Sequence, residues 1–433
     1  MKNTTILIIF FILLSSNIFS QVTDKEKLAD KETFDIYISK DWNKLIKIGE
    51  KYLSEGVDFY YLQYRIGIAY YNLKKYGKAV KYFEKVYKQT PKDDIVTEYL
   101  FYSYFFSGMY DDSRVLSYKM SDSLKEKLSI KGNNLAEFMS MQYIYEINED
   151  YEEVASKTTF SQDVVTKQNT FNVSLKHNIK KRLSILHGYT QVNLTTKKTN
   201  NIGYYFQDTQ QGEYFLKLNY HFARRSDFII GFHILNTALS KQKTTEDAIP
   251  VYSRGTKSFA FSMAYNKRLP LGGFSLGSSV SNLNFKLQIQ PALNIYLYPL
   301  GNSKFYTNTS FDFQIQKSLM SYGNGNKVAG NTDYGYIIKQ SIGFSIAKYL
   351  WIAPFVSYGN IMDYTENFAT SINNDSDLTK IKAGALLNFS YNHLGIFAEY
   401  DYKIKSNSYF SSGNFLDTDY INHTVTFGIN WYF

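Results

Sequence analysis

Alternation of apolar and polar residues dominates the chain from residue 132 to residue 433. The segment FKLQIQPALNIYLYP (285–299) is the clearest case, because its apolar side chains recur at every second position. Successive side chains of a strand point to opposite faces, so this segment has one apolar and one polar face. Further strands of this kind are predicted at 214–222, 259–265, 305–316, 336–346, 381–391 and 396–404.

Connections between the predicted strands alternate between short and long. The short ones are 178–182, 222–227, 298–304 and 390–394, and the long polar ones are 195–213, 240–258, 318–335 and 363–378. The strands have about ten or more residues, the length that crosses a bilayer at a tilt. Short turns on one side and long loops on the other are typical of an outer-membrane barrel, whose sheet closes so that every backbone group is paired.

The number of strands follows from their direction. Bacterial barrels of this kind have an even number of strands. Counted back from Phe433, placed on the periplasmic side, thirteen strands are evident, and the earliest, 168–180, would run inwards from outside. The segment EFMSMQYIYEI (137–147) supplies a fourteenth strand, with 149–167 as an external loop. The sequence predicts an antiparallel barrel of about 14 strands over 132–433, and 12 or 16 strands would also be even.

The last predicted strand, NHTVTFGINWYF, ends in aromatic residues. Its apolar residues occupy every second position back from Phe433, and Trp431 is among them. Aromatic residues gather where a barrel meets the membrane interface. A last strand of this form looks like the assembly signal of outer-membrane barrels, which the barrel-insertion machinery reads. The alternative is an edge strand of a soluble sandwich, but a long apolar edge invites aggregation in water.

Residues 25–130 have helical periodicity instead. The stretch 60–93 carries small and large residues at the positions that a tetratricopeptide repeat of 34 residues requires. Its helix-packing residues are Gly67, Tyr70, Ala79 and Phe83, and Pro91 ends the second helix. A degenerate copy follows at 94–127, and 41–53 resembles the second helix of an earlier copy, so two to three repeats are predicted. A plain pair of helical hairpins is the alternative.

Residues 1–20 read as a secretory signal peptide, with one early lysine, the apolar run Ile6–Leu14 and small residues before the cut. A membrane anchor is the alternative, although the run is short for a span. The 433-residue chain has no cysteine, which excludes disulfides and cysteine-based zinc sites. Its mean hydropathy of −0.32 argues against a helical membrane protein. The 40 tyrosines and 33 phenylalanines suit a surface where an apolar environment borders on water.

A signal peptide (1–20), a tetratricopeptide unit (21–131) and a C-terminal barrel (132–433) together resemble YaiO-type outer-membrane proteins. They are more distantly similar to tetratricopeptide-plus-barrel exporters of exopolysaccharide. The resemblance implies an outer-membrane protein of a Gram-negative bacterium whose helical domain lies in the periplasm. It also implies outer-membrane lipid, a docked periplasmic protein and a saccharide polymer as partners, with no nucleic acid. A cofactor is not expected.

Few residues suggest chemistry. GFSLG (273–277) matches the G-x-S-x-G nucleophile elbow, but that motif needs a following helix and here it opens a strand. The six histidines lack the spacing of a metal site on one strand. The loop segments 373–377 and 417–419 carry enough acid to hold calcium, although solvated polarity explains them equally simply. The sequence therefore does not predict an enzyme, although a hydrolase acting on lipid at the barrel wall stays an alternative.

The polar face of the strands supplies candidate residues for a lumen. Alternation places Lys176, Lys217, Lys286, Lys339, Lys382 and Lys403 inward, with only Asp312, Glu399 and Asp401 as acids. A net positive lumen would concentrate anions, and Tyr296, Tyr298 and Tyr306 are expected to stack on sugars. We therefore expect a pore for an exported polysaccharide, in particular an anionic one. The alternative is a non-conducting anchor that holds a periplasmic complex.

Overall fold

The computed structural model describes most of the chain in two compact units, 1–103 and 104–433. The described residues are 24–130, 136–158, 161–200, 203–243, 248–249, 255–318, 332–374, 377–411 and 414–433. The expected signal peptide, 1–20, lies outside them. The boundary expected at 131/132 also lies outside the described residues, and the compact units divide at 103/104.

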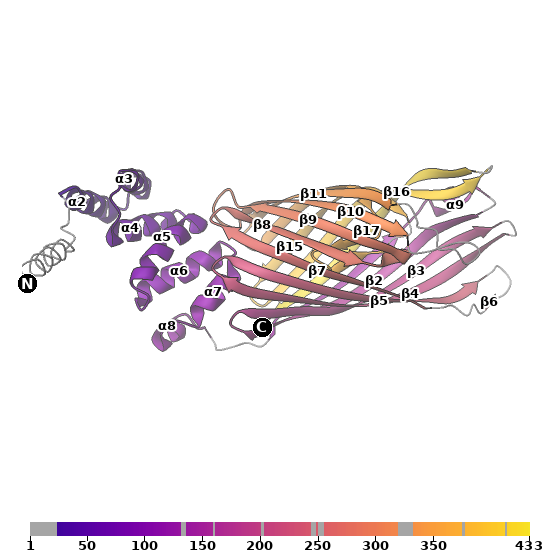
Figure 1. Cartoon of the computed structure of the whole chain (residues 1–433), viewed down its shortest axis with the longest axis horizontal. Helices are drawn as coiled ribbons and strands as arrows, with labels where there is room; N and C mark the ends of the chain where they lie inside the picture. Colours follow the sequence, from indigo (N-terminus) through magenta and orange to yellow (C-terminus); the bar gives the residue numbers. More distant parts are fainter. Residues whose placement is uncertain are drawn as a thin grey trace, which may run out of the picture. The chain divides into compact units, whose positions relative to one another are not determined.

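Seven helices precede the barrel in the described part of the chain (Figure 1). They are α2 (Asp24–Ser39), α3 (Trp42–Ser54), α4 (Tyr60–Asn72), α5 (Tyr76–Gln89), α6 (Asp94–Phe106), α7 (Tyr110–Ser117) and α8 (Asp122–Lys127). Within these described residues, no helix is long and apolar enough to cross a bilayer. The first unit contains α2 to α5 and most of α6, and the second unit begins near the end of α6.

The α4–α5 hairpin packs as the repeat pattern predicts. Phe83 and Ala79 are fully buried, and Tyr70 is 4% exposed. A Cβ atom at Gly67 would lie 3.0 Å from the Phe83 ring, so the two helices approach closely because this residue has no side chain. Helix α5 ends at Gln89, two residues before Pro91. The prediction of a tetratricopeptide hairpin at 60–93 is therefore confirmed.

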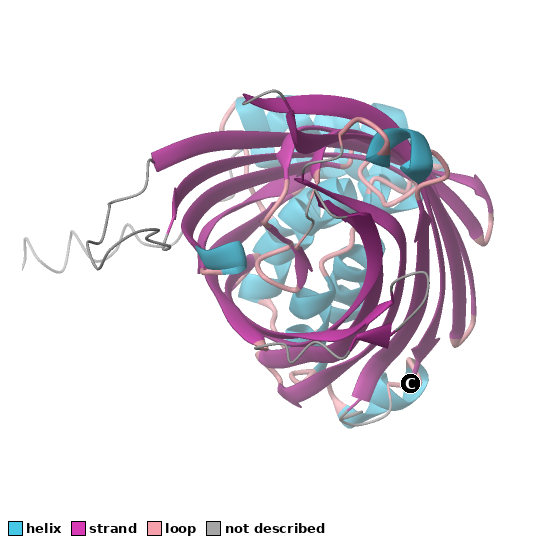
Figure 2. Cartoon of the chain, turned by 90° about the vertical axis from the view of Figure 1, so that its right-hand side faces the viewer, coloured by secondary structure: helices cyan, strands magenta, loops and turns pink. Residues whose placement is uncertain are grey.

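Fourteen strands of the second unit close into an antiparallel barrel, formed by consecutive neighbours and sealed where β1 pairs with β17 (Figure 2). They are β1 (Ala136–Ile147), β2 (Ser161–Lys180), β3 (Leu183–Asn200), β4 (Gly203–Ala223), β5 (Ser226–Lys243), β7 (Thr256–Leu269), β8 (Gly272–Ser281), β9 (Lys286–Leu297), β10 (Phe305–Ser318), β11 (Thr332–Ala347), β12 (Leu350–Ile361), β15 (Leu378–Tyr391), β16 (Leu394–Ser411) and β17 (Asn414–Tyr432). The predicted strand at 137–147 is β1, so the count of fourteen is confirmed.

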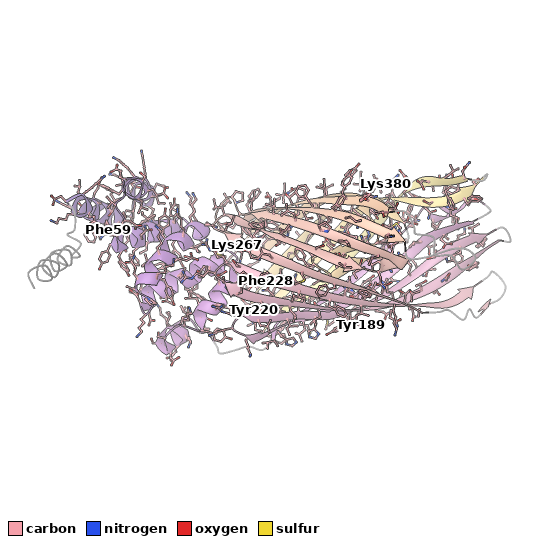
Figure 3. All side chains as sticks on the ribbon, viewed as in Figure 1. Phe59, Tyr189, Tyr220, Phe228, Lys267 and Lys380 are labelled. Atoms are coloured by element: carbon pink, nitrogen blue, oxygen red, sulfur yellow. The ribbon has the colours of Figure 1, made fainter. Side chains whose placement is uncertain are left out.

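The alternation along each strand sorts side chains between the two faces of the wall. On β10, Phe311 and Phe313 are exposed on the outside, whereas Asp312 and Gln314 between them are buried inside. Tyr189, Tyr220 and Phe228 are likewise half-exposed on the outer surface (Figure 3). Trp431 and Phe433 are also about half-exposed. Apolar and aromatic side chains therefore cover the face that lipid contacts in an outer-membrane barrel.

The external connections differ from the prediction. Residues 195–213 are not a long loop, because β3 and β4 continue to Asn200 and from Gly203 as one paired ladder. The segment 149–167 contains the short helix α9 (Tyr151–Ala155) and the start of β2. Within 363–378, residues 364–373 form the hairpin of β13 (Tyr364–Glu366) and β14 (Ser371–Asn373), and this hairpin contacts the inner wall. Polar composition predicted a connection but not its path.

Candidate functional site

A cavity of about 630 Å³ lies inside the barrel. Its wall consists mainly of amide and hydroxyl side chains, and a few aromatic rings interrupt them. Among the amide and hydroxyl groups are Ser140, Gln142, Gln168, Thr170, Asn172, Ser174, Thr190, Gln211, Thr370, Asn373, Asn374 and Thr424. These groups can both donate hydrogen bonds to and accept them from a hydrated or hydroxyl-rich solute.

The charges around this cavity correct the expectation of a positive lumen. Five carboxylates line it, against three lysines. The acids are Glu146, Glu213, Glu366, Glu399 and Asp401, and the lysines are Lys339, Lys382 and Lys403. The alternation argument had placed Glu213 and Glu366 in external loops and had not counted Glu146 of the inferred strand 137–147, so it omitted three of these carboxylates.

The lysines of the cavity are paired. Lys382 Nζ lies 3.0 Å from Asp401 and 3.8 Å from Glu399. Lys339 Nζ lies 2.6 Å from Glu366. Ion pairs with little solvent keep their geometry, because separating them would leave a buried charge unpaired. A solute in this cavity would therefore meet lysines that are already paired, together with neutral polar groups.

A cluster around Glu146 of β1 joins both sides of the barrel seam. Its carboxylate lies 3.0 Å from Lys405 Nζ and also pairs with Lys403, both on β16. Thr424 of β17 donates a hydrogen bond of 3.2 Å to the same carboxylate. Lys405 is fully buried, so Glu146 supplies the counter-charge that this lysine requires.

Side chains of the inner wall hold the β13–β14 hairpin by hydrogen bonds to its backbone, as a neighbouring strand would. Gln290 of β9 donates to the Thr365 carbonyl at 2.7 Å and accepts from the Thr365 N–H at 3.1 Å. His233 Nδ1 of β5 lies 3.1 Å from the Ala369 carbonyl. A Cβ atom at Gly231 would lie 2.1 Å from the Phe368 carbonyl, so the hairpin touches the wall backbone there.

This hairpin crosses the lumen. It leaves the wall between β12 and β15, which stand seven places around the ring from β4 and β5. Its far contacts are on these opposite strands, because Asn374 donates to Gln211 of β4 at 2.8 Å and Ala369 meets β5. In a ring of fourteen strands, seven places is the opposite side. The hairpin therefore narrows the barrel from wall to wall.

Helix α7 contacts the ends of several strands on the short-turn side of the barrel. Asp112 accepts a hydrogen bond from the Arg225 N–H at 2.7 Å, and its other oxygen lies 3.3 Å from Arg268 Nε. Asp111 accepts from Asn219 at 3.1 Å and pairs with Arg114 at 2.5 Å. Burial disfavours the ionised form of Asp111, but the Arg114 and Arg268 guanidinium groups outweigh it and hold its pKa below the ordinary value.

The receiving groups on the barrel form one buried network. Arg268 Nη2 lies 2.7 Å from Asp227 Oδ2, and His221 Nδ1 lies 2.7 Å from Asp227 Oδ1. His221 Nε2 is 3.4 Å from Asp112. Asp112, His221 and Asp227 are each at most 4% exposed. Residues from α7, β4, β5 and β7 are therefore joined through alternating charges.

The structure separates the other predicted lumen residues from the main cavity. Lys286 pairs with Asp363 at 3.5 Å, and Asp312 accepts from Gln290 at 3.0 Å in a smaller chamber. Tyr296, Tyr298 and Tyr306 lie together near the periplasmic turns, where Tyr296 donates to Asn266 at 3.1 Å. Of the predicted set, the cavity thus collects Lys339, Lys382, Lys403, Glu399 and Asp401.

The geometry gives little support to a nucleophile elbow or to a metal site. GFSLG lies within β8, which continues to Ser281, so no helix directly follows the motif, and the Ser275 hydroxyl donates to Asn266 instead of a histidine. His177 and His187 meet across neighbouring strands, with their Nε2 atoms 3.1 Å apart. Single-strand spacing could not reveal that pair. Among the described residues, no group of three or more histidine or acidic side chains is arranged to hold a metal ion.

Comparison with known proteins supports the helical repeat directly. The tetratricopeptide repeat family matches residues 60–93. A search of curated proteins finds no match to the chain.

Solved outer-membrane barrels are similar to it at low identity. A Pseudomonas aeruginosa FadL homologue is 9% identical with a TM-score of 0.42, over 69% of this chain and 90% of its own. The P. putida toluene transporter TodX is 7% identical with a TM-score of 0.43, over 70% and 91%. The translocator domain of the autotransporter NalP from Neisseria meningitidis is 10% identical with a TM-score of 0.32, over 75% and 98%. No inference about activity is drawn from likenesses this weak.

Proposed function

We propose that this outer-membrane barrel is a gated passage for hydrophilic solutes, and that a neutral saccharide is the cargo its lumen fits best. The observation that supports this proposal is the polar cavity, in which neutral amide and hydroxyl groups surround lysines that are already paired. Sugars present hydroxyl groups that donate and accept hydrogen bonds, so such a wall matches them without a fixed charge. The cavity charge favours a neutral cargo over the anionic one that the sequence suggested.

The direction of transport that we propose is export, with a periplasmic partner docked on the repeats. Stacked helical repeats present extended surfaces for binding other proteins. The resemblance to YaiO-type proteins and to tetratricopeptide-plus-barrel exporters of exopolysaccharide supports the same assignment. In this proposal, the helical repeats lie in the periplasm and the partner delivers the polymer to the barrel.

Liposome swelling tests the passage. Full-length protein is reconstituted and compared with a variant in which residues 364–373 are replaced by a short glycine–serine linker. The variant should admit neutral di- and trisaccharides several times faster than the native protein, because the wall-to-wall hairpin is gone. Gln290→Ala should give a smaller gain, since it removes the tether to Thr365 and a hydrogen bond to Asp312 but leaves the hairpin in place. Gln191→Ala, on the outer surface beside Tyr189, is the matched control.

A second candidate is a non-conducting anchor that holds a periplasmic complex. The observation that favours it is the hairpin that crosses the lumen. The swelling assay separates the two candidates. Sugar uptake by the hairpin-replaced variant no faster than by protein-free liposomes would refute the passage and leave the anchor.

A further inference from the structure

We infer that helix α7 is a built-in latch that holds the periplasmic mouth of the barrel mostly closed and opens transiently to let cargo enter. The inference goes beyond the proposed passage and rests on it for its purpose. Its own basis is the set of contacts between the α6–α7 turn, α7 and the strand ends, all within the unit 104–433.

The contacts reach nearly opposite sides of the mouth. On one side, Arg114 of α7 lies 4.0 Å from Glu137 of β1. On the other side is Tyr298, which follows β9, and β1 and β9 are seven places apart around the ring of fourteen. Just before α7, a Cβ atom at Gly108 would lie 3.8 Å from the Tyr298 hydroxyl. The α6–α7 turn and α7 therefore extend across the opening instead of lying along one rim.

Charged contacts hold the latch on the strand ends. Asp111 and Asp112 enter a socket of donors made by Asn219, His221, Arg268 and the Arg225 N–H. Charge-assisted hydrogen bonds of this kind are strong while buried and weaken when water or another charged group replaces a partner. A contact built this way can separate without exposing a large hydrophobic surface. An apolar plug would lack that property.

The shortness of α7 fits this role. The preceding repeat has a second helix of fourteen residues, α5, whereas α7 has eight. The contacts of α7 with β4 and β7 take the place of those that a further repeat would make. The same segment that ends the repeat array therefore also binds the mouth. A partner that binds the repeats has a covalent path to the latch, since α6 continues from the first unit into the second.

Cysteine chemistry tests the latch, because the natural chain has no cysteine. Ser174→Cys places one thiol on the cavity wall, on β2. The rate at which a membrane-impermeant maleimide modifies it in folded, detergent-purified protein reports access to the lumen. Adding Asp112→Asn should raise that rate about tenfold or more, because losing a charge-assisted hydrogen bond shifts an equilibrium by at least that factor. Asp122→Asn, an exposed carboxylate on α8, is the matched control.

A second, independent variant locks the latch. Asp111→Cys with Asn219→Cys places two thiols where side-chain atoms are now 3.1 Å apart. In the hairpin-replaced background, closing them with a short bis-methanethiosulfonate should abolish ion conductance in a planar bilayer, and reduction should restore it. Equal maleimide rates in the Asp112→Asn and Asp122→Asn proteins, or full conductance in the cross-linked protein, would overturn the latch.

The outcomes separate the latch from the passage. If sugars pass no variant but the maleimide rate still depends on Asp112, the latch stands and the passage is wrong. If the hairpin-replaced protein admits sugars while the lock changes nothing, the passage stands and the latch is wrong.

Discussion

The Glu146 cluster gives the sharpest test of what holds the barrel closed. Glu146→Gln keeps the size of the side chain and its hydrogen bond with Thr424 but removes the negative charge between Lys403 and Lys405. Lys405 is fully buried, so it cannot recover its counter-charge from solvent. Lys403 is part of the cavity wall and can be hydrated there.

The size of the effect follows from that difference in burial. Removing one partner of a buried pair costs about 3–5 kcal/mol, because it leaves an uncompensated charge. The exposed pair between Lys380 and Asp419 makes the same kind of contact at 2.6 Å on the surface of the protein. An exposed pair contributes about 0–1 kcal/mol. Glu146→Gln should therefore lower the free energy of unfolding several times more than Asp419→Asn.

Urea unfolding in lipid vesicles, followed by loss of the heat-modifiable folded band on a gel, measures this difference. Adding Lys405→Met to Glu146→Gln should recover most of the loss, since it removes the stranded charge and keeps the volume. If Glu146→Gln unfolds within about 1 kcal/mol of Asp419→Asn, the range of exposed pairs, the cluster does not stabilise the seam. Failure of Lys405→Met to recover stability would mean that Glu146 acts through something other than charge.

Further predictions concern the lipid face, the lumen and the helices. Leu293→Arg should cost roughly 2–4 kcal/mol of barrel stability and Asn294→Arg much less, because only Leu293 contacts lipid; equal losses would mean a register error. The hairpin-replaced barrel should show no anion preference in its reversal potential, because four carboxylates against three lysines stay on the cavity wall after Glu366 is removed with the hairpin, and any selectivity should fade above about 1 M salt; clear anion selectivity would contradict the charge assignment. Gly67→Leu should destabilise the α4–α5 hairpin by about 1–3 kcal/mol through overpacking against Phe83, visible as earlier loss of helical circular dichroism, with the exposed Lys81→Leu as control. The hydrogen bond to Glu32, with burial, raises the pKa of Tyr52 to about 12, so its stabilising contribution is present below pH 10 and lost as pH rises through about 12; Tyr52→Phe should abolish that part of the alkaline loss of helicity.

The sequence by itself determined which parts are helix and strand, and which side of the wall each residue faces. Both are local properties. A strand has period two, and one apolar face suffices to assign Phe311 outward and Asp312 inward. The repeat positions Gly67 and Phe83 are equally local, because they belong to one hairpin of adjacent helices. The even strand number followed from direction alone, so β1 could be inferred from a weak pattern.

Only the tertiary structure decided which segment occupies the lumen and which residues neutralise the charged side chains there. Thr365 meets Gln290 from 75 residues away, and Arg268 pairs with Asp111 across 157 residues. The sequence of neither the hairpin nor α7 indicates which residues it contacts, since a short polar segment can lie in solvent or against a polar wall. For the same reason, the alternation of residues did not predict the sign of the net charge around the cavity. Alternation gives the face of each lysine, whereas the partner that cancels its charge comes from whichever distant segment the closed ring brings beside it.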